Sequence, residues 1–421
     1  MRALLAMVLF ASSVQAQSVT VVKLGRLIDG KGNVVTNAAV VVRGDRVERV
    51  LSATDALPAG ANVIDLRPLT GLPVLIDVHT QMTFYWDRTP GTKPWAQLGT
   101  LGAPAAAPVT VFLAQENARK TLESGVTTVR DLGSWEYTDM AMRDLINRGA
   151  MIGPRMFVAG YGLHISSAPP KPGAIPDPGQ CDGVDECERV ARQQIGAGVD
   201  WIKMYGSTGS DQDVTGFETF SYDEMKAATD VAHRAGKRIA IHSYGPEGAR
   251  DAVRAGADSV EHATDMDDAT IAEMARKKIV YVPTVEHNRY YIAHRDEYGY
   301  DEAVAKRLED YVQRNLATLR KAIKAGVPVA MGSDAVFTGF GENARELERF
   351  VEAGMTPAEA IRSATAVGAS LMNMSDSVGA VAPNYYADIL AVQGDPLADI
   401  AAVTRHVVWV MKGGKVVVDK R

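Results

Sequence analysis

The central part of the chain alternates short apolar runs with amphipathic stretches, and this alternation constrains the fold more than any other feature. The eight runs are LPVLIDVH, VTTVRDL, RMFVAG, DWIKMY, RIAIHS, SVEHA, IVYVPT and PVAMGSD. Helical patterns such as EGARDAVRAGA and DDATIAEMARKK lie between them. Strand-like runs separated by helices predict an α/β fold of parallel units, and eight units can close into a TIM-like (β/α)₈ barrel. An open doubly wound sheet is the alternative, but no G-x-G-x-x-G motif follows an early strand.

Both ends of the chain have a different pattern. From Val19 to Val50, apolar and polar residues alternate between Gly and Asn turn signals, as in antiparallel strands. The C-terminal end repeats this pattern in YYADILAVQGD and RHVVWVMKGGKVVVDK, where a Gly-Gly pair suits a hairpin turn. We therefore expect residues 17–70 and 383–421 to build one β-sandwich, with the barrel formed by residues 71–382.

The first sixteen residues, 1–16, have the pattern of a signal peptide. Arg2 precedes the apolar stretch Ala3–Ala11, which is too short to span a bilayer, and small residues lead up to Ala16 as in an A-x-A-like cleavage site. A buried core segment is the alternative interpretation. We expect cleavage near Ala16 and a periplasmic or secreted protein. No Cys follows the apolar stretch, so no membrane anchor is expected.

Composition and cysteine usage narrow the range of partners. An apolar content of 46% and a charged content of 23% are typical of a soluble enzyme. A net charge of -6 offers no basic stripe for nucleic acid, which favours a small-molecule partner. Cys181 and Cys187 lie in the loop-like segment PDPGQCDGVDEC. In an oxidising compartment they could form a local disulfide, and two separate thiols fit the spacing equally well.

Five of the strand-like runs end on, or contain near their ends, a residue that can bind a metal or transfer a proton. These residues are His79, Lys203, His242, His262 and Asp334. Any one of them alone would more simply be a hydrogen-bonded core residue. The chain has only eight His, however, and a random scatter would not put three of them at one structural position. Because barrel active sites lie at the C-terminal ends of strands, we expect these side chains to form a site.

The residue types in this set predict metal-dependent hydrolysis. Imidazole and carboxylate donors suit Zn²⁺ or another divalent transition metal. Such a metal lowers the pKa of a bound water from 15.7 to about 7, and Asp334 could pass the proton of that water to the leaving group. Lys203 as an ammonium would be repelled by the metal, so a role as ligand requires carboxylation by CO₂. Unmodified, it could bind a substrate anion or form a Schiff base.

Eight motifs in this order resemble the amidohydrolase superfamily, most closely its imidazolonepropionase-like and Xaa-Pro or Xaa-Arg dipeptidase branch. They are GLPVLIDVHTQM, SGVTTVRDLG, AGVDWIKMYGSTG, IAIHSYGPEG, AGADSVEHATDMDD, VPTVEHN, MGSDA and VGAVAPNYYADILAVQGDPL. The resemblance implies that His79 is the first His of an H-x-H motif, that a carboxylated Lys203 bridges two metals, and that His242 and His262 are further ligands. It also implies that Asp334 is both a ligand and the proton shuttle.

The sequence departs from the family pattern at Gln81, where a second His is expected. A neutral amide oxygen is a weaker donor toward Zn²⁺ than imidazole. Three outcomes are open: one Zn²⁺ per subunit, two metals with Gln81 or water completing the site, or a catalytically impaired barrel that only binds. We expect hydrolysis to be retained, because the four later functional positions are intact.

Four further residues are candidates for contact with substrate. His287 follows the seventh run and could polarise the scissile carbonyl or hold its developing oxyanion. Tyr205 and Tyr244 each follow a candidate ligand by two residues, so they should point to the same side as that ligand; packing would explain them equally well. His164 lies in a Pro/Gly-rich loop that could cover the barrel mouth.

The predicted function is therefore exported, metal-dependent hydrolysis of an amide bond in a dipeptide, at a C-terminal amino acid or in an N-acyl amino acid. A cyclic amide or lactone is the alternative substrate. The long insert FYWDRTPGTKPWAQ after the first run could shape specificity or pack against a second subunit. Relatives of this kind often associate, which leaves a homo-oligomer open.

Overall fold

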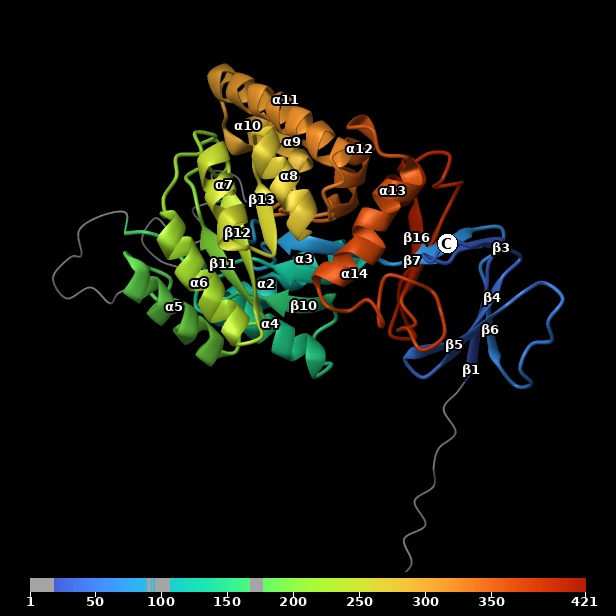
Figure 1. The fold of residues 1–421 in the computed structure, drawn as a ribbon. Helices are drawn as coiled ribbons and strands as arrows, with labels where there is room; N and C mark the ends of the chain where they lie inside the picture. The colour runs from blue at the N-terminus through green and yellow to red at the C-terminus, as the bar shows by residue number, and fades with distance from the viewer. Residues whose placement is uncertain (1–18, 89–91, 93, 95–106, 167–176) are drawn as a thin grey trace, which may run out of the picture.

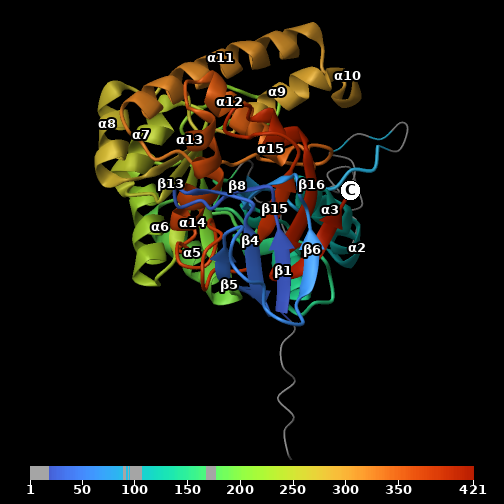
Figure 2. The same ribbon diagram turned by 90° about the vertical axis from the view of Figure 1, so that its right-hand side faces the viewer.

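A computed structural model describes residues 19–88, 92, 94, 107–166 and 177–421. The predicted signal peptide lies outside the described residues, as does half of the insert FYWDRTPGTKPWAQ after the first barrel strand. Figures 1 and 2 show a β-rich part that contains both ends of the described chain beside a larger α/β part. Within the described ranges, no helix has the length and apolar character needed to cross a membrane.

The β-rich part consists of two sheets, and one of them combines strands from both chain ends. The first sheet has the order β5-β4-β1-β6, with β1 (Val19–Lys23), β4 (Ala39–Arg43), β5 (Arg46–Leu51) and β6 (Asn62–Asp65). The second has the order β17-β16-β15-β7-β2-β3, with β2 (Arg26–Ile28), β3 (Val34–Thr36), β7 (Thr70–Pro73), β15 (Ile389–Val392), β16 (Val407–Lys412) and β17 (Lys415–Asp419). Trp409 is fully buried in the apolar cluster that this part encloses. The predicted sandwich assembled from both ends is confirmed.

Seven parallel strands in the described chain form the wall of the α/β part. One sheet has the order β10-β9-β8, with β8 (Leu75–Thr80), β9 (Val126–Asp131) and β10 (Arg155–Val158). The other has the order β11-β12-β13-β14, with β11 (Trp201–Tyr205), β12 (Arg238–Ser243), β13 (Ser259–His262) and β14 (Val280–Val282). These strands coincide with the first seven apolar runs of the sequence.

Isolated parallel bridges connect these two sheets on both sides, and the eighth run lies in the gap between β14 and β8. The bridges are Leu163 with Met204, Tyr281 with Val329, and Thr80 with Ala335. The eighth run makes single bridges rather than a regular strand. Pro328 at its start has no N–H to donate, and Asp334 at its end has a positive φ of 48°. The predicted (β/α)₈ architecture is thus confirmed, with an irregular eighth member.

Helices surround the strands (Figure 1). They are α2 (Ala107–Leu113), α3 (Gln115–Glu123), α4 (Thr138–Asn147), α5 (Val184–Ala197), α6 (Tyr222–Arg234), α7 (Pro246–Ala255), α8 (Asp268–Lys277), α9 (Val285–Ala293), α10 (Arg295–Tyr298), α11 (Glu302–Lys324), α12 (Glu346–Glu352), α13 (Pro357–Arg362), α14 (Gly368–Leu371) and α15 (Ala401–Arg405). Short helical turns lie at Asn343–Arg345 (η1) and Ser363–Val367 (η2). Local sequence sets several helix starts: a capping box of Ser221 and Glu224 begins α6.

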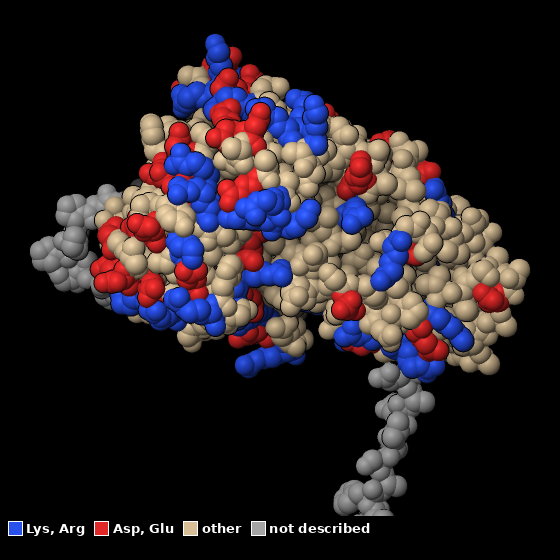
Figure 3. Space-filling model, viewed as in Figure 1, with Lys and Arg blue, Asp and Glu red and all other residues tan. Residues whose placement is uncertain are grey.

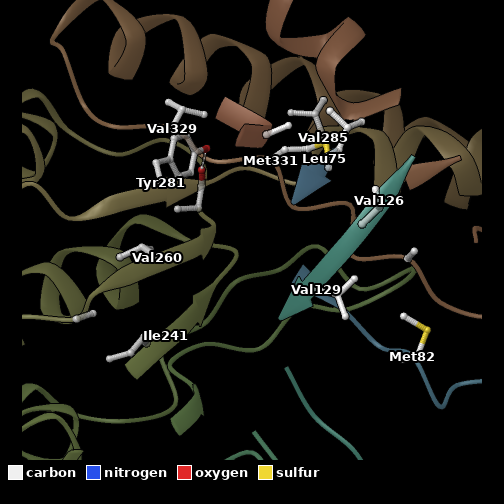
Figure 4. Packing of buried hydrophobic residues seen from close by; sticks show 14 of the residues in the cluster. Leu75, Met82, Val126, Val129, Ile241, Val260, Tyr281, Val285, Val329 and Met331 are labelled. Carbon is white, nitrogen blue, oxygen red and sulfur yellow. Dashed lines mark hydrogen bonds between the residues drawn. The ribbon is translucent and has the colours of Figure 1, made fainter. Parts of the chain in front are cut away.

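Alternation along the strands separates the packing face from the face that carries the site. In β12, Ile239 and Ile241 belong to the large apolar cluster that includes helix residues, so Ala240 and His242 point to the opposite face. Figure 4 shows Ile241 and Val260 side by side on neighbouring strands of this cluster. The apolar face therefore fixes which strand residues can reach the barrel interior.

Charged side chains of both signs are spread over the surface of the α/β part. Figure 3 shows Lys and Arg interspersed with Asp and Glu over the helices of the α/β part. Many of these side chains pair with one another, as in the bridge of 2.5 Å between Lys226 Nζ and Asp230 Oδ2 on α6. On the face shown, the charges are mixed rather than gathered into a single basic surface.

Candidate active site

His79, His262 and Asp334 meet at the C-terminal ends of the barrel strands. One potential ligand atom from each side chain lies within 4.8 Å of the other two. His79 Nε2 is 3.4 Å from Asp334 Oδ1, and the ring centroids of His79 and His262 are 5.1 Å apart. All three residues are buried. Residues that are 255 positions apart at the extremes thus form one compact cluster of nitrogen and oxygen donors.

A buried carboxylate sets the orientation of His79. Nδ1 of His79 donates to Oε2 of Glu261 over 2.8 Å, so the lone pair of the neutral ring is at Nε2, facing Asp334. Glu261 also accepts from Arg130 at 2.8 Å and from Ser259 at 2.5 Å. Burial opposes its charge, but Arg130 and His79 hold the pKa of Glu261 at about 2. Glu261 and Arg130 were not singled out in the sequence; charged residues inside the apolar runs SVEHA and VTTVRDL were the available signal.

A second pair of imidazoles extends the cluster. The rings of His242 and His262 have centroids 4.5 Å apart, and His262 Nδ1 lies 2.7 Å from Thr284 Oγ1. Burial, followed by the neighbouring cationic groups, lowers the pKa of both His242 and His262 well below the usual value. Both rings are therefore neutral at pH 7, which is the form that binds a metal.

Lys203 is buried beside these imidazoles at the end of β11. Burial lowers the pKa of its ammonium to about 8, although the carboxylates of Glu261 and Asp334 act in the opposite direction. Its Nζ lies 5.2 Å from the centre of the Tyr205 ring. If Lys203 were always protonated, its ammonium would lie among three imidazoles and the buried guanidinium of Arg130.

Asp334 and His287 form the other wall of the site. The backbone N–H of Asp334 donates to the carbonyl of His79 at 2.8 Å, which ties the eighth run to β8. His287, on α9, donates from Nδ1 to the carbonyl of Asp334 at 2.8 Å, and its Nε2 is 3.5 Å from Asp334 Oδ2. A cavity of about 20 Å³ lies against both side chains, which is room for about one water molecule.

Asp77 holds the segment that carries Asp334 in place, and the sequence did not identify it as a site residue. It is fully buried and accepts hydrogen bonds from Ser333 N at 2.9 Å, Ser333 Oγ at 2.5 Å and Asn343 Nδ2 at 3.0 Å. Burial raises the pKa of Asp77 to about 6. The aspartate thus joins β8, the residue before Asp334 and the turn η1, and thereby positions Asp334.

Gln81 reaches the same region, and the residue is 8% exposed. Its Oε1 is buried and has no hydrogen-bond partner among the described residues. A Cβ built on Gly133 would lie 3.4 Å from this oxygen and 3.2 Å from Tyr205 Oη. Gln81 therefore occupies the side of the site formed by β9 and β11.

The two candidate tyrosines lie beside the imidazoles, whereas His164 does not. The Tyr205 ring is 5.5 Å from the His242 ring, and the Tyr244 ring is 4.9 Å from the His262 ring. Burial raises the pKa of Tyr205 to about 12. His164 instead faces Asp177, with Nε2 3.7 Å from Oδ2, in the loop before α5. Residues 167–176 of that loop lie outside the described part of the chain.

Cys181 and Cys187 are both buried and are free thiols. Cys181 precedes α5, and Cys187 is in its first turn. A hydrogen bond with Cys187, together with burial, raises the pKa of the Cys181 thiol. The spacing allowed either a disulfide or two separate thiols, and the structure has two separate thiols. Both side chains are part of the large apolar cluster.

The donor set matches a divalent transition metal. Two imidazoles and one carboxylate gather within one ion's reach. Nε2 of His242 is buried and, in the described residues, has no hydrogen-bond partner. Neutral imidazole nitrogens and a carboxylate oxygen are the ligands that borderline metals prefer. These residues therefore suit the metal that the sequence predicts, without fixing which metal it is.

Comparison with known protein families shows which family the chain belongs to. The sequence pattern of the amidohydrolase family matches residues 71–417. The chain belongs to the amidohydrolase family. Ochratoxinase from Aspergillus niger is 31% identical, with 97% of this chain and 88% of that protein aligned. Imidazolonepropionase from Streptomyces coelicolor is 27% identical over 84% of this chain and 85% of that protein.

Solved structures agree with this assignment. A Xaa-Pro dipeptidase with bound methionine has a TM-score of 0.83 and 30% identity, covering 95% of this amidohydrolase and 99% of that chain. A prolidase in complex with N-methylphosphonate-L-proline has a TM-score of 0.84 and 27% identity, covering 96% and 100%. The predicted superfamily is confirmed, and this amidohydrolase is a hydrolase that acts on C–N bonds.

Proposed function

We propose that this amidohydrolase is an exported, metal-dependent enzyme that hydrolyses the amide bond of a dipeptide, or the bond to a C-terminal or N-acylated amino acid. The proposal depends above all on the donors of His79, His262 and Asp334, which lie within 4.8 Å of one another. The solved relatives named for dipeptidase and prolidase activity support the substrate class, because methionine and a proline phosphonate are bound in two of them.

The metal we propose is Zn²⁺, one or two per subunit, with other divalent transition metals as substitutes. His79, His262 and Asp334 would hold it, and His242 would supply a further nitrogen. A bound divalent transition metal lowers the pKa of its water and polarises the substrate carbonyl. Lys203 would take part as a carboxylated, anionic side chain, as the family resemblance implies.

Asp334 and His287 have the chemistry for proton transfer and charge stabilisation. Asp334 would accept a proton from the attacking water and pass it to the leaving nitrogen, held in place by its backbone bond to His79. His287 donates from Nδ1 to a carbonyl, so its neutral ring offers a lone pair at Nε2. To donate a hydrogen bond to a developing oxyanion, His287 would have to carry a proton on Nε2 as well, as an imidazolium. That cation would lie beside the Asp334 carboxylate, whose Oδ2 is 3.5 Å from Nε2.

The decisive experiment combines metal analysis with a substrate panel. The purified protein should contain a divalent transition metal by elemental analysis and should hydrolyse at least one dipeptide or N-acyl amino acid. Asp334→Asn should abolish turnover while the circular dichroism spectrum stays unchanged. Asp310→Asn, at an exposed position of α11, is the matched control and should keep full activity. Unchanged turnover in Asp334→Asn would show that the assigned proton shuttle is wrong.

The imidazolonepropionase relative favours one alternative substrate class, a cyclic amide or lactone. The same panel should therefore include a cyclic amide and a lactone. Turnover of these compounds, with none of the linear amides cleaved, would replace the proposed substrate class while keeping the same site.

Export and the modification of Lys203 each have a direct test. N-terminal sequencing of protein from a periplasmic fraction should begin near Gln17 if the proposed signal peptide is removed. A carboxylated Lys203 should give a carbamate signal in ¹³C NMR after growth with labelled CO₂, and Lys203→Ala should lack it. A Lys203→Ala protein with the same signal would show that another lysine carries the modification.

A further inference from the structure

Gln81 carries a buried acceptor that the described part of the protein leaves unsatisfied. The residue is 8% exposed, and Oε1 has no hydrogen-bond partner there. Buried acceptors are normally paired, because an unpaired one loses its hydration without compensation. An oxygen left open at the end of a barrel strand, next to a catalytic cluster, is therefore a candidate contact for a ligand.

The space beside this oxygen depends on Gly133. A Cβ on that residue would lie 3.4 Å from Gln81 Oε1 and 3.2 Å from Tyr205 Oη. Gly133 has a φ of +149°, which L side chains rarely adopt. The backbone at this position thus keeps the amide of Gln81 and the hydroxyl of Tyr205 free of an intervening side chain.

The position of Asp334 indicates which part of a substrate would reach Gln81. Asp334 must lie near the leaving nitrogen if it is to deliver the proton, and His287 stands on the same side. The leaving amine therefore lies toward the eighth run and α9. The acyl part of the substrate then extends toward β9 and β11, where Gly133 and Tyr205 flank Gln81.

We propose that Gln81 Oε1 accepts a hydrogen bond from the amino group on the acyl side of the scissile amide, and so selects peptides over simple N-acyl amino acids. This inference rests on the proposed function as an amide hydrolase and narrows its substrate class. An α-amino group only donates when it is an ammonium, and it matches an oxygen that only accepts. Gln81 is a specificity residue in this view and not a metal ligand.

Metal binding by Gln81 is the competing role, and two observations oppose it. Three other donors, those of His79, His262 and Asp334, already lie within 4.8 Å of one another, and Gln81 Oε1 lies beside Gly133 and Tyr205. A neutral amide oxygen is also a weaker donor toward a borderline metal than an imidazole.

The test uses a matched substrate pair: a dipeptide that the protein cleaves, and its des-amino analogue, in which hydrogen replaces the α-amino group. The native protein should prefer the dipeptide in kcat/KM by about tenfold to a hundredfold, the usual effect of a hydrogen bond to a charged group. Gln81→Leu removes the acceptor and should reduce the preference to near unity by slowing the dipeptide alone. Gln81→Glu keeps an acceptor and should restore it.

Metal content separates the two roles of Gln81. Gln81→Leu should hold the same amount of metal per subunit as the native protein by elemental analysis. Loss of metal in Gln81→Leu would show that the oxygen serves a metal and would overturn the proposal. A dipeptide preference that persists in Gln81→Leu would overturn it as well.

Failure of the proposed function would look different. If the metal-loaded native protein cleaves neither member of the pair, calorimetric titration of both compounds still tests the inference. The native protein should then bind the dipeptide more tightly than the des-amino analogue. Gln81→Leu should bind the two compounds with equal affinity. Equal binding, or no binding of either compound, to the native protein would refute the inference.

Discussion

Nδ1 of His79 and Oε2 of Glu261 lie 2.8 Å apart in the buried interior of the barrel. Both side chains are at most 1% exposed, so the bond is shielded from water. The carboxylate fixes which ring nitrogen is protonated and directs the other toward Asp334. If His79 binds the proposed metal, removal of such a partner should lower the metal affinity by about 10-fold to 100-fold.

Glu261→Gln should lower the free energy of unfolding by about 3–5 kcal/mol, because Arg130 would keep a buried charge without its counter-ion. Urea unfolding of the metal-depleted protein measures this effect separately from metal binding. Ser259→Ala is the matched control: it removes one hydrogen bond to the same carboxylate and one from Arg130 but keeps the ion pair, so it should cost less, about 2 kcal/mol. Equal losses in the two variants would show that the ion pair contributes little.

His287→Asn should reduce kcat by about 10²-fold to 10³-fold with little change in KM, if the ring stabilises charge that develops only in the transition state. Steady-state kinetics on the best dipeptide measures both constants. Tyr291→Phe is the control, because its ring is 4.7 Å from that of His287 and only a hydroxyl is lost. A native kcat in His287→Asn would leave the residue with a packing role.

Removing the metal should lower the melting temperature by about 5 °C or more, since a ligand that binds only the folded state stabilises it. Thermal unfolding before and after chelation, and after Zn²⁺ is returned, measures the shift. His262→Ala should show little response to the chelator. His233→Ala, whose ring contacts Asp258 near the surface, should respond as the native protein does. An equal response in both variants would place the metal elsewhere.

Glu346 should make the protein less stable as the pH rises. Burial raises the pKa of this carboxyl from 4.5 to about 8. Between these values the folded state binds a proton that the unfolded state has released, so the free energy of unfolding falls with increasing pH. Urea unfolding at several pH values should show this slope in the native protein and a flatter one in Glu346→Gln. Glu309→Gln, exposed on α11, should keep the native slope.

Cys181 and Cys187 should resist a thiol reagent in the folded protein, because both are buried and Cys181 is held protonated. Titration in guanidinium should reveal two thiols per chain. Fast reaction of the native protein would mean that α5 opens readily at its start. Two thiols missing even after denaturation would show that the pair is oxidised in the purified protein.

Much of the fold was predictable from the sequence, because apolar periodicity records which face of each element is buried. The barrel strands β8 to β14 coincide with the first seven apolar runs, and β15 to β17 join the N-terminal strands as the alternation at both ends predicts. The structure of the eighth run was harder to predict from the sequence. Its apolar residues indicate a strand, but only isolated bridges at Val329 and Ala335 form.

The candidate ligands were visible because they lie at strand ends, whereas the residues that position them were not. Glu261, Arg130 and Asp77 act through partners that are distant in sequence, such as Ser333, 256 residues from Asp77. A charged residue inside an apolar run shows that a buried partner exists without showing which one. The role of His164 stays a prediction: its side chain faces Asp177, and residues 167–176 of the same loop lie outside the described part of the chain.

The sequence by itself determined the barrel, the two-ended sandwich, the family and the set of candidate ligands, since each depends on residue type and local spacing. Only the tertiary structure decided which of these side chains meet. It brought His79, His262 and Asp334 within reach of one ion, left Cys181 and Cys187 unbridged and turned Gln81 toward Gly133. The physical reason is that such contacts depend on how the parallel strands of the barrel are registered and twisted against one another, and no local pattern of residues encodes that geometry.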